Sequence, residues 1–330
     1  MTDDDLARAL RRLDPAETPL DAPLPLDAER RLRQILDRPP VRRRRRPALA
    51  WASAAAIALI LAIVAGGLWM PGTSASALTP TPLVYTATPG DAAEVIAEAQ
   101  ARLAAGDGGV TAERRSLSLG WYFSASPDGA EATVFRREWV DLRWKEDLSG
   151  SVVTTAAEAT NADGDTVPNV DPTPGTVVGE LRFVRNQFRP LSPAPPDASA
   201  DAMRALVVST TGAADTLTAG DAMVGVRSLQ GEWTLDDAQQ SALLDVLADA
   251  PGLRVLGITQ DRLGREVVGL AGIPSTTANT DVTLLLSTDT GRIVGFESAL
   301  IDANTDLDLP AGSLTEYALW DVQDREDAPR

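Results

Sequence analysis

The sequence of 330 residues contains no cysteine and no histidine. Without cysteine, the chain has no disulfide to cross-link an exported domain, no thiolate nucleophile and no lipoprotein anchor built on a cysteine. Without histidine, the Ser-His and Cys-His nucleophilic pairs, the usual zinc sites and histidine general bases are excluded too. Only carboxylate, hydroxyl and lysine chemistry remains. Because the commonest catalytic and metal-binding side chains are excluded, we expect a protein that is not an enzyme and that holds no metal or cofactor.

Lysine is nearly absent as well, because Lys145 stands against 29 arginines. The charges are unevenly placed along the chain. Residues 1–46 carry 12 arginines and 9 acidic residues, a net charge of +3, whereas residues 71–330 carry 18 basic and 38 acidic residues, a net charge of −20. A segment this acidic repels nucleic acid and anionic headgroups, so no nucleic-acid partner is expected for it.

The longest stretch without a charge is Ala48 to Met70, 23 residues rich in alanine, leucine and isoleucine. As a helix it is about 35 Å long, which is enough to cross a hydrocarbon core of about 30 Å. Trp51 and Trp69 lie near its two ends, where indole rings suit the headgroup region. The sequence therefore predicts a single transmembrane helix over residues 47–70.

The orientation of this helix is indicated by five consecutive arginines directly before it: Arg42, Arg43, Arg44, Arg45 and Arg46. No comparable basic cluster follows the apolar stretch, so the positive-inside rule places the N-terminus in the cytoplasm and the C-terminus outside. A nucleic-acid or localisation patch is the alternative, but the position beside an apolar stretch favours a topology signal. We expect a single-pass protein of the cell membrane.

Four regions follow from this topology. Residues 1–46 are expected to be a partly disordered cytoplasmic tail that docks on a cytoplasmic protein partner or stays unstructured. Residues 71–90, rich in Pro, Ser and Thr, are expected to be a stalk, and residues 91–330 an extracytoplasmic domain. Ala75-Ser76-Ala77 has the small-x-small pattern of a cleavage site, but the length of the apolar run favours an uncleaved anchor.

Local patterns within residues 91–330 predict both helices and strands. Asp91 with Glu94 indicates a helix start, followed by an apolar stripe that ends at Gly106, and Thr234 with Asp237 indicates another. Further helices are expected over 201–210 and 213–229. Strands are expected over 115–123, 132–142, 177–188, 253–259, 266–273, 282–288, 293–301 and 314–322. This order indicates an α+β fold, a curved antiparallel sheet with helices on one face.

Several architectural features occur together: the tail ending in Arg42 to Arg46, the alanine-rich span, the helix at Ala92 to Ala105, the segment Ala250 to Val255 and the turn Asp289 to Gly295. In these features the chain resembles uncharacterised actinobacterial single-pass membrane proteins associated with extracytoplasmic-function sigma factors. The resemblance implies an exported domain with a half-barrel fold similar to lipoprotein carriers and sigma regulators. It implies no catalytic residues.

Oxygen ligands alternate in one loop, at Asn161, Asp163 and Asp165, and Asp171 follows. This pattern is similar to a calcium loop, but an EF-hand needs glycine at its sixth position and glutamate at its twelfth. Gly164 stands at the fourth position and no glutamate ends the loop. We therefore interpret the segment as a solvated turn that holds no metal.

Two other groups of polar residues are candidates for chemistry. Glu138 and Asp141 are paired carboxylates of the kind used in glycoside hydrolysis, but strand alternation places them on opposite faces. Lys145 with Ser149 is a local Ser-Lys pair whose charged neighbours indicate an exposed loop. We expect neither group to be catalytic.

Aromatic residues concentrate in the early strands, at Trp121, Tyr122, Phe123, Trp139 and Trp144. They predict either a packed core or an apolar pocket for a lipid or peptide, and the core is favoured. The leading hypothesis is a membrane-anchored, non-enzymatic regulatory or sensor protein with an extracytoplasmic binding domain, linked to sigma-factor signalling. The alternative is a lipid- or lipoprotein-binding module of the cell envelope, which requires a large cavity with an apolar lining.

Overall fold

A computed structural model of the chain describes residues 79–88, 90–106, 110–123, 134–212, 217–277 and 279–322. All of them belong to one compact unit, Ile60–Arg330. Four helices and a nine-stranded antiparallel sheet form this part of the chain, which confirms the predicted α+β class. The helices are α4 (Ala92–Ala105), α5 (Ala200–Thr211), α6 (Ala219–Gln230) and α7 (Asp237–Ala248). The strands are β1 (Arg115–Tyr122), β2 (Glu138–Trp144), β3 (Gly150–Ala156), β4 (Val177–Phe183), β5 (Arg254–Gln260), β6 (Glu266–Gly272), β7 (Thr280–Ser287), β8 (Ile293–Leu300) and β9 (Leu314–Leu319).

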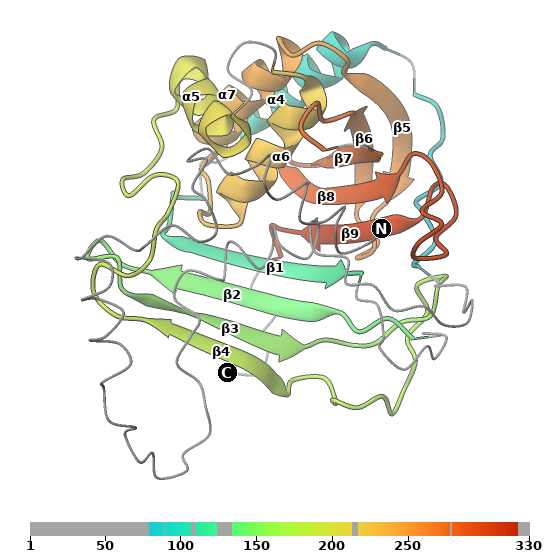
Figure 1. The fold of residues 1–330 in the computed structure, drawn as a ribbon. Helices are drawn as coiled ribbons and strands as arrows, with labels where there is room; N and C mark the ends of the chain where they lie inside the picture. The colour runs from blue at the N-terminus through green and yellow to red at the C-terminus, as the bar shows by residue number, and fades with distance from the viewer. Residues whose placement is uncertain are drawn as a thin grey trace, which may run out of the picture. The chain divides into compact units, whose positions relative to one another are not determined.

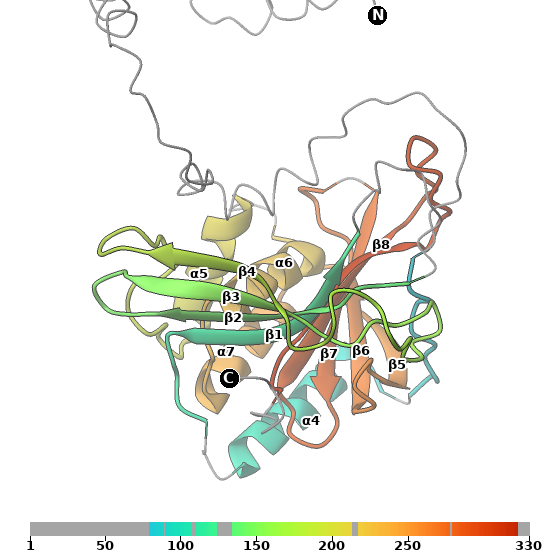
Figure 2. The same cartoon turned by 90° about the horizontal axis from the view of Figure 1, so that it is seen from below.

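The strand order is β4-β3-β2-β1-β9-β8-β7-β6-β5, and every neighbouring pair is antiparallel. Two four-stranded meanders, β1 to β4 and β5 to β8, are thus joined by the last strand, β9, which lies between β1 and β8 (Figure 1). The sheet is curved and does not close, so that β4 and β5 form its two edges (Figure 2).

The helices cover one face of the sheet, as the sequence predicts (Figure 2). The main core contains residues from all four helices together with alternate residues of the strands, among them Leu142, Leu270, Leu284 and Phe296. Because side chains alternate between faces along a strand, the intervening residues point to the other face. We call these the helix face and the open face.

Helix α4 forms as its local sequence predicts. Asp91 accepts a hydrogen bond from the Glu94 N–H, and the Glu94 carboxylate accepts one from the Asp91 N–H, which completes a capping box. The apolar stripe is buried and Gly106 ends the helix.

The start of α7 differs from the prediction, because its N-cap is Asp236, in a capping box with Gln239. Thr234 donates its hydroxyl to the Arg115 carbonyl (2.9 Å), and Asp237 pairs with Arg292. The two side chains that indicated a cap therefore bond to residues outside the helix.

Strand β3 was not predicted. Its residues Gly150 to Thr155 are all partly buried, so neither face shows the strong apolar alternation that marks a half-buried strand.

Within the described residues, the helices are too short or too polar to traverse a bilayer. The predicted tail (1–46), the arginines Arg42, Arg43, Arg44, Arg45 and Arg46, and the predicted span (47–70) lie outside the described residues. Residues 79–88, which belong to the predicted stalk, lie against the sheet.

Candidate functional site

A second apolar cluster occupies the open face of the sheet. The Trp121 ring packs edge-on against Phe135, with 5.6 Å between centroids, and stacks on Tyr317 at 6.3 Å. On the helix face, Trp144 packs against Trp233 with 5.0 Å between centroids. Trp121 and Trp144 are therefore packed core, as favoured from the sequence. Phe123 and Trp139 are partly buried, and Tyr122 is 40% exposed, so the prediction of a core does not hold for all five aromatic residues.

The chain segment 79–88, which we call the strap, covers part of this cluster. Thr86 and Ile258 exchange two backbone hydrogen bonds of 2.8 Å, so the strap pairs with the outer edge of β5. Leu83 and Tyr85 point toward the sheet, whereas Val84 between them is 83% exposed. The strap thus behaves as a short edge strand with one apolar side.

Two glycines allow the strap to approach the sheet. A Cβ atom at Gly257 would collide with the Thr86 carbonyl, and the backbone of Gly257 has a φ of +118°. A Cβ atom at Gly269 would collide with the Tyr85 ring. Glycine is therefore required where the strap crosses β5 and β6.

A buried ion pair lies beneath the strap. Arg262 Nε is 2.8 Å from Glu297 Oε1, and the side chains are only 11% and 7% exposed. The same guanidinium lies 4.7 Å from the centroid of the Tyr317 ring and donates to the Thr81 carbonyl (3.1 Å). Arg262 therefore joins the strap, the sheet and the buried carboxylate.

Burial perturbs the ionisable groups of this cluster. It raises the pKa of Glu297, although the neighbouring Arg262 opposes the rise, and it raises the pKa of Tyr317 to about 12. It also raises the pKa of Tyr85, to which the nearby Glu297 charge adds. The buried Tyr85 hydroxyl has no hydrogen-bond partner among the described residues, so it is a polar group left without compensation beneath the strap.

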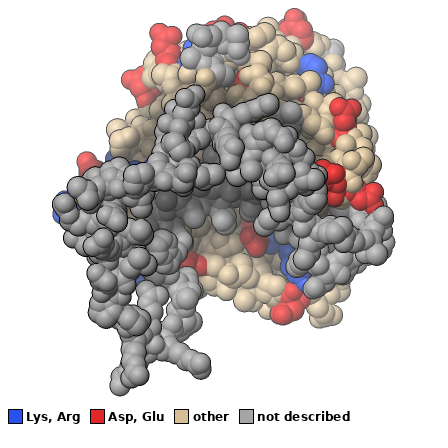
Figure 3. All heavy atoms as spheres, in the orientation of Figure 1, with Lys and Arg blue, Asp and Glu red and all other residues tan. Residues whose placement is uncertain are grey.

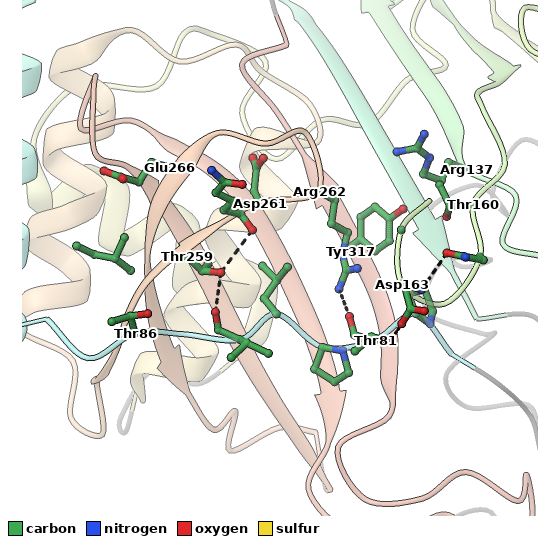
Figure 4. A pocket seen from close by; sticks show the side chains of 18 residues that line it. Thr81, Thr86, Arg137, Thr160, Asp163, Thr259, Asp261, Arg262, Glu266 and Tyr317 are labelled. Carbon is green, nitrogen blue, oxygen red and sulfur yellow. Dashed lines mark hydrogen bonds between the residues drawn. The ribbon is translucent and has the colours of Figure 1, made fainter. Parts of the chain in front are cut away.

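A cavity of about 680 Å³ opens beside the strap (Figure 4). The strap forms one wall, and the others come from β5, the β5–β6 turn, the loop at 160–164, Arg137 directly before β2 and Tyr317 of β9. Its lining is mainly hydroxyl, amide and charged, with Thr81, Thr86, Arg137, Thr160, Asn161, Asp163, Thr259, Gln260, Asp261, Arg262 and Glu266. Such a surface suits a polar ligand.

A smaller hollow of about 400 Å³ lies along the strap as well, and its lining is mainly apolar, with Leu83, Leu256, Leu300, Ile301 and Leu314 beside Tyr85 and Glu297. In the larger cavity polar residues outnumber apolar ones such as Leu83, Val84 and Ile258, so its lining differs from the apolar one that the lipid-binding alternative requires.

Acidic side chains outnumber basic ones on the surface seen in Figure 3, and they are spread over it. This distribution agrees with the acidic composition of residues 71–330. Within the described residues, no group of three or more acidic side chains is placed to hold a metal ion.

The calcium-like loop forms a hydrogen-bonded turn. Asn161 Oδ1 accepts from the N–H groups of Asp163 (3.0 Å) and Asp165 (2.9 Å), so the oxygen expected as a ligand is used within the loop. Asp163 accepts from the Thr81 hydroxyl (3.4 Å), which ties the loop to the strap. Asp171 lies elsewhere, where its carbonyl accepts from Arg136.

The paired carboxylates of β2 do not converge. Asp141 accepts hydrogen bonds from Arg115 (3.2 Å) and Arg143 (2.8 Å), which lower its pKa although burial opposes them. Glu138, three residues away, belongs to the other face of the strand, and burial raises its pKa. The geometry for glycoside hydrolysis is absent here.

Lys145 and Ser149 form the turn between β2 and β3. The Lys145 N–H donates to the Ser149 carbonyl (2.8 Å), but the Ser149 hydroxyl donates to Asp147 (2.6 Å). The Ser149 hydroxyl and the Ser149 N–H both donate to Asp147 and lower its pKa. The serine is therefore held as a turn residue.

The sequence reasoning missed the cluster of Tyr85, Arg262, Glu297 and Tyr317. These residues come from the strap, the β5–β6 turn, β8 and β9, far apart in the chain. One local signal was available, because Glu297 is the one charged residue of the strand Ile293–Leu300. A charge in a buried strand indicates a paired partner.

No family model matches the chain, and no curated protein matches it either. The solved structures that resemble it include the crystal structure of MucB in complex with MucA(peri), with 16% identity and a TM-score of 0.25, over 69% of this chain and 52% of that chain. The complex structure of Pseudomonas aeruginosa MucA/MucB matches with 14% identity and a TM-score of 0.24, over 69% of this chain and 55% of that one. The chain thus spans about half the length of these structures. Since the TM-scores lie below 0.5, the fold described above rests on the chain's own geometry.

Proposed function

We propose that the chain is a membrane-anchored, non-enzymatic regulatory protein whose extracytoplasmic domain binds a ligand and whose tail engages a cytoplasmic protein. The more specific form of the proposal names a sigma factor as that protein, because the family resemblance of the sequence implies it. One observation supports the proposal most: the strap belongs to the predicted stalk that follows the span in the sequence, and it forms a wall of the cavity of about 680 Å³.

This arrangement links the cavity to the predicted anchor. The strap is held by a small set of bonds, among them Thr86 with Ile258, the Thr259 hydroxyl with the Val84 carbonyl (2.8 Å) and Arg262 with the Thr81 carbonyl. A ligand in the cavity touches the same strap. Ligand binding therefore changes how firmly the strap is held against the sheet. A sensor requires that the ligand bind with different affinity when the strap is held and when it is released.

A binding role fits the charged groups beside the cavity better than acid–base chemistry does. Glu297 is paired with Arg262, and Asp261 accepts bonds from Arg265 Nε (2.7 Å) and two backbone N–H groups. The bonds of these two carboxylates stabilise the fold, so neither carboxylate is free to act as an acid or a base. The polar lining favours a polar ligand over the acyl chain of the alternative hypothesis.

The outward position of the domain can be tested with single cysteines, because the chain has none of its own. We expect Val84→Cys in the full-length protein to react with a membrane-impermeant maleimide on intact spheroplasts, since Val84 is 83% exposed. Thr2→Cys should react only after lysis. Labelling of Thr2→Cys on intact spheroplasts, with Val84→Cys protected, would refute the orientation.

The part of the proposal that concerns signalling requires a protein partner for the tail. Full-length protein should retain a specific cytoplasmic protein in a pull-down from solubilised membranes. A variant whose residues 1–41 are scrambled, with Arg42 to Arg46 kept, should lose that protein while it still inserts in the membrane. Equal retention by both proteins would contradict the role of the tail and leave the cavity's role to be judged separately.

A further inference from the structure

The outer edge of β4 is open. Among the described residues, no strand pairs with that side of β4, whereas Thr86 of the strap pairs with the other edge of the sheet, at β5. Exposed apolar side chains accompany the open edge, since Val177, Val178 and Val184 are 58%, 44% and 71% exposed. An edge with free backbone groups and apolar side chains is a template for pairing with another strand.

The hydrogen bonds of β3 show which residues of β4 face outward. Ala156 donates its N–H to the Thr176 carbonyl on the β4 side, and the next residue, Ala157, donates toward β2. Along an antiparallel strand, the backbone groups of successive residues bond alternately to one neighbouring strand and to the other. The β3–β4 register therefore shows which residues of β4 bond to β3. Glu180 and Arg182 alternate with those residues, so their N–H and C=O groups point to the open edge.

We propose that this edge binds a second copy of the chain, antiparallel, about a two-fold axis through Leu181. In that register Glu180 of each copy lies opposite Arg182 of the other, and these two positions are the ones with outward backbone groups. A shift of the axis to Glu180 would place two glutamates opposite each other, and a shift to Arg182 would place two arginines. Like charges directly opposite are destabilising, so charge selects the axis at Leu181.

The same register places Val178 of each copy near Val184 of the other, just beyond the paired segment, because Val178 is the extra residue of a bulge in β4 and the Val184 backbone bonds to Gln187 in the turn after the strand. Contact between their exposed side chains removes apolar surface from water. A two-fold contact uses one patch on both partners and closes at two copies. At the other end of the sheet, Thr86 of the strap already pairs with Ile258 of β5.

The register is tested by a disulfide in the full-length protein in its membrane. Leu181→Cys places the only cysteine of the chain on the proposed axis, at a non-hydrogen-bonded pair with about 4.5 Å between Cα atoms, which suits a disulfide. We expect oxidation to give a cross-linked dimer. Gly179→Cys, two residues away, should not cross-link, because its copies would lie about 13 Å apart along the strands.

Charge reversal tests the partner. In the Leu181→Cys background, Glu180→Arg and Arg182→Glu should each lower the cross-linked fraction about tenfold, because each places like charges opposite each other. Co-expression of the two variants, one of them epitope-tagged, should restore a mixed dimer, since opposite charges then meet again. Both variants lose the bond between Glu180 and Arg182 within one strand (2.6 Å), so the rescue reports only on the contact between copies.

Three outcomes would overturn the proposal: no dimer from Leu181→Cys, equal cross-linking from Gly179→Cys, or full cross-linking in either charge variant alone. A disulfide-linked product of another mass would show that a different protein occupies the edge. Thermal unfolding of each variant checks that the domain has remained folded.

Discussion

Several ionisable side chains of this domain are buried, and burial changes their pKa values. Glu232, which follows α6, accepts a hydrogen bond from the Leu191 N–H (2.7 Å). Burial raises the pKa of its carboxyl to about 7, although this hydrogen bond opposes the rise. The group therefore binds its proton more tightly in the folded chain than in the unfolded one.

The sign of the pH effect follows from this difference. An unfolded glutamate ionises near pH 4.3, so between about 4.3 and 7 the native state holds more protons. The contribution of Glu232 to stability is complete below that window and is lost as the pH rises through it, by up to about 3 kcal/mol. We expect Glu232→Gln, which keeps an oxygen acceptor for Leu191, to remove this part of the slope.

Urea unfolding at pH 5 and pH 8, followed by tryptophan fluorescence, measures the effect as the difference between variant and wild type. Glu158→Gln is the matched control, because that side chain is 63% exposed. The control should keep the wild-type slope. An unchanged slope in Glu232→Gln would show that the carboxyl is already ionised at pH 5.

At the scale of elements, the strap depends on glycine in the strand beneath it. Gly269→Ala would drive a methyl group into the Tyr85 ring, and we expect the strap to move away from β5 and β6. Hydrogen exchange of the Thr86 and Ile258 amides should become at least tenfold faster, because each bonds to the other residue's carbonyl.

The control for this variant is Gly179→Ala in β4, where a Cβ atom would make ordinary contact with Thr154 at 3.5 Å. Its strap amides should exchange as in the wild type. Unchanged exchange in Gly269→Ala would mean that the Tyr85 ring moves while the strap stays in place.

Local sequence was a good guide to elements whose stabilising contacts are local. Helix α4 carries its cap at Asp91 and its stripe within 14 residues, so it was predicted almost to the residue. Strand β3 was missed because partial burial on both faces removes the alternation on which strand prediction depends. The predicted cap of α7 was wrong because Thr234 bonds to Arg115 of β1 and Asp237 pairs with Arg292, directly before β8.

The site was harder to foresee than the fold. The Arg262–Glu297 pair and the Tyr317 ring meet only because β6, β7, β8 and β9 pair in one register. Periodicity within each segment carries no information on which segments become neighbours. The strap has no apolar run long enough to mark it, and its proline-rich composition indicates a stalk.

For the whole molecule, the decisive prediction concerns the arginine run before the apolar stretch. Replacing Arg42 to Arg46 by glutamine should lower the fraction of chains with an external C-terminus, because each arginine near an anionic leaflet contributes about 1 kcal/mol. Maleimide labelling of Val84→Cys on intact spheroplasts should fall accordingly. Glutamine at Arg8, Arg11 and Arg12, farther from the apolar stretch, should have little effect.

Unchanged labelling after the loss of Arg42 to Arg46 would show that another part of the chain sets the orientation. The proposal of a cytoplasmic tail would then need a different basis. The fold of the described domain would be unaffected, since it does not depend on the arginines.

The order of the strands also bears on how the domain is made. The first and last strands, β1 and β9, are neighbours at the centre of the sheet, and β9 alone joins the two meanders. Until residues 314–319 have been synthesised, each meander has a bare inner edge. The sheet is therefore complete only once β9 is available, and a product that stops before Leu314 exposes both edges to proteases.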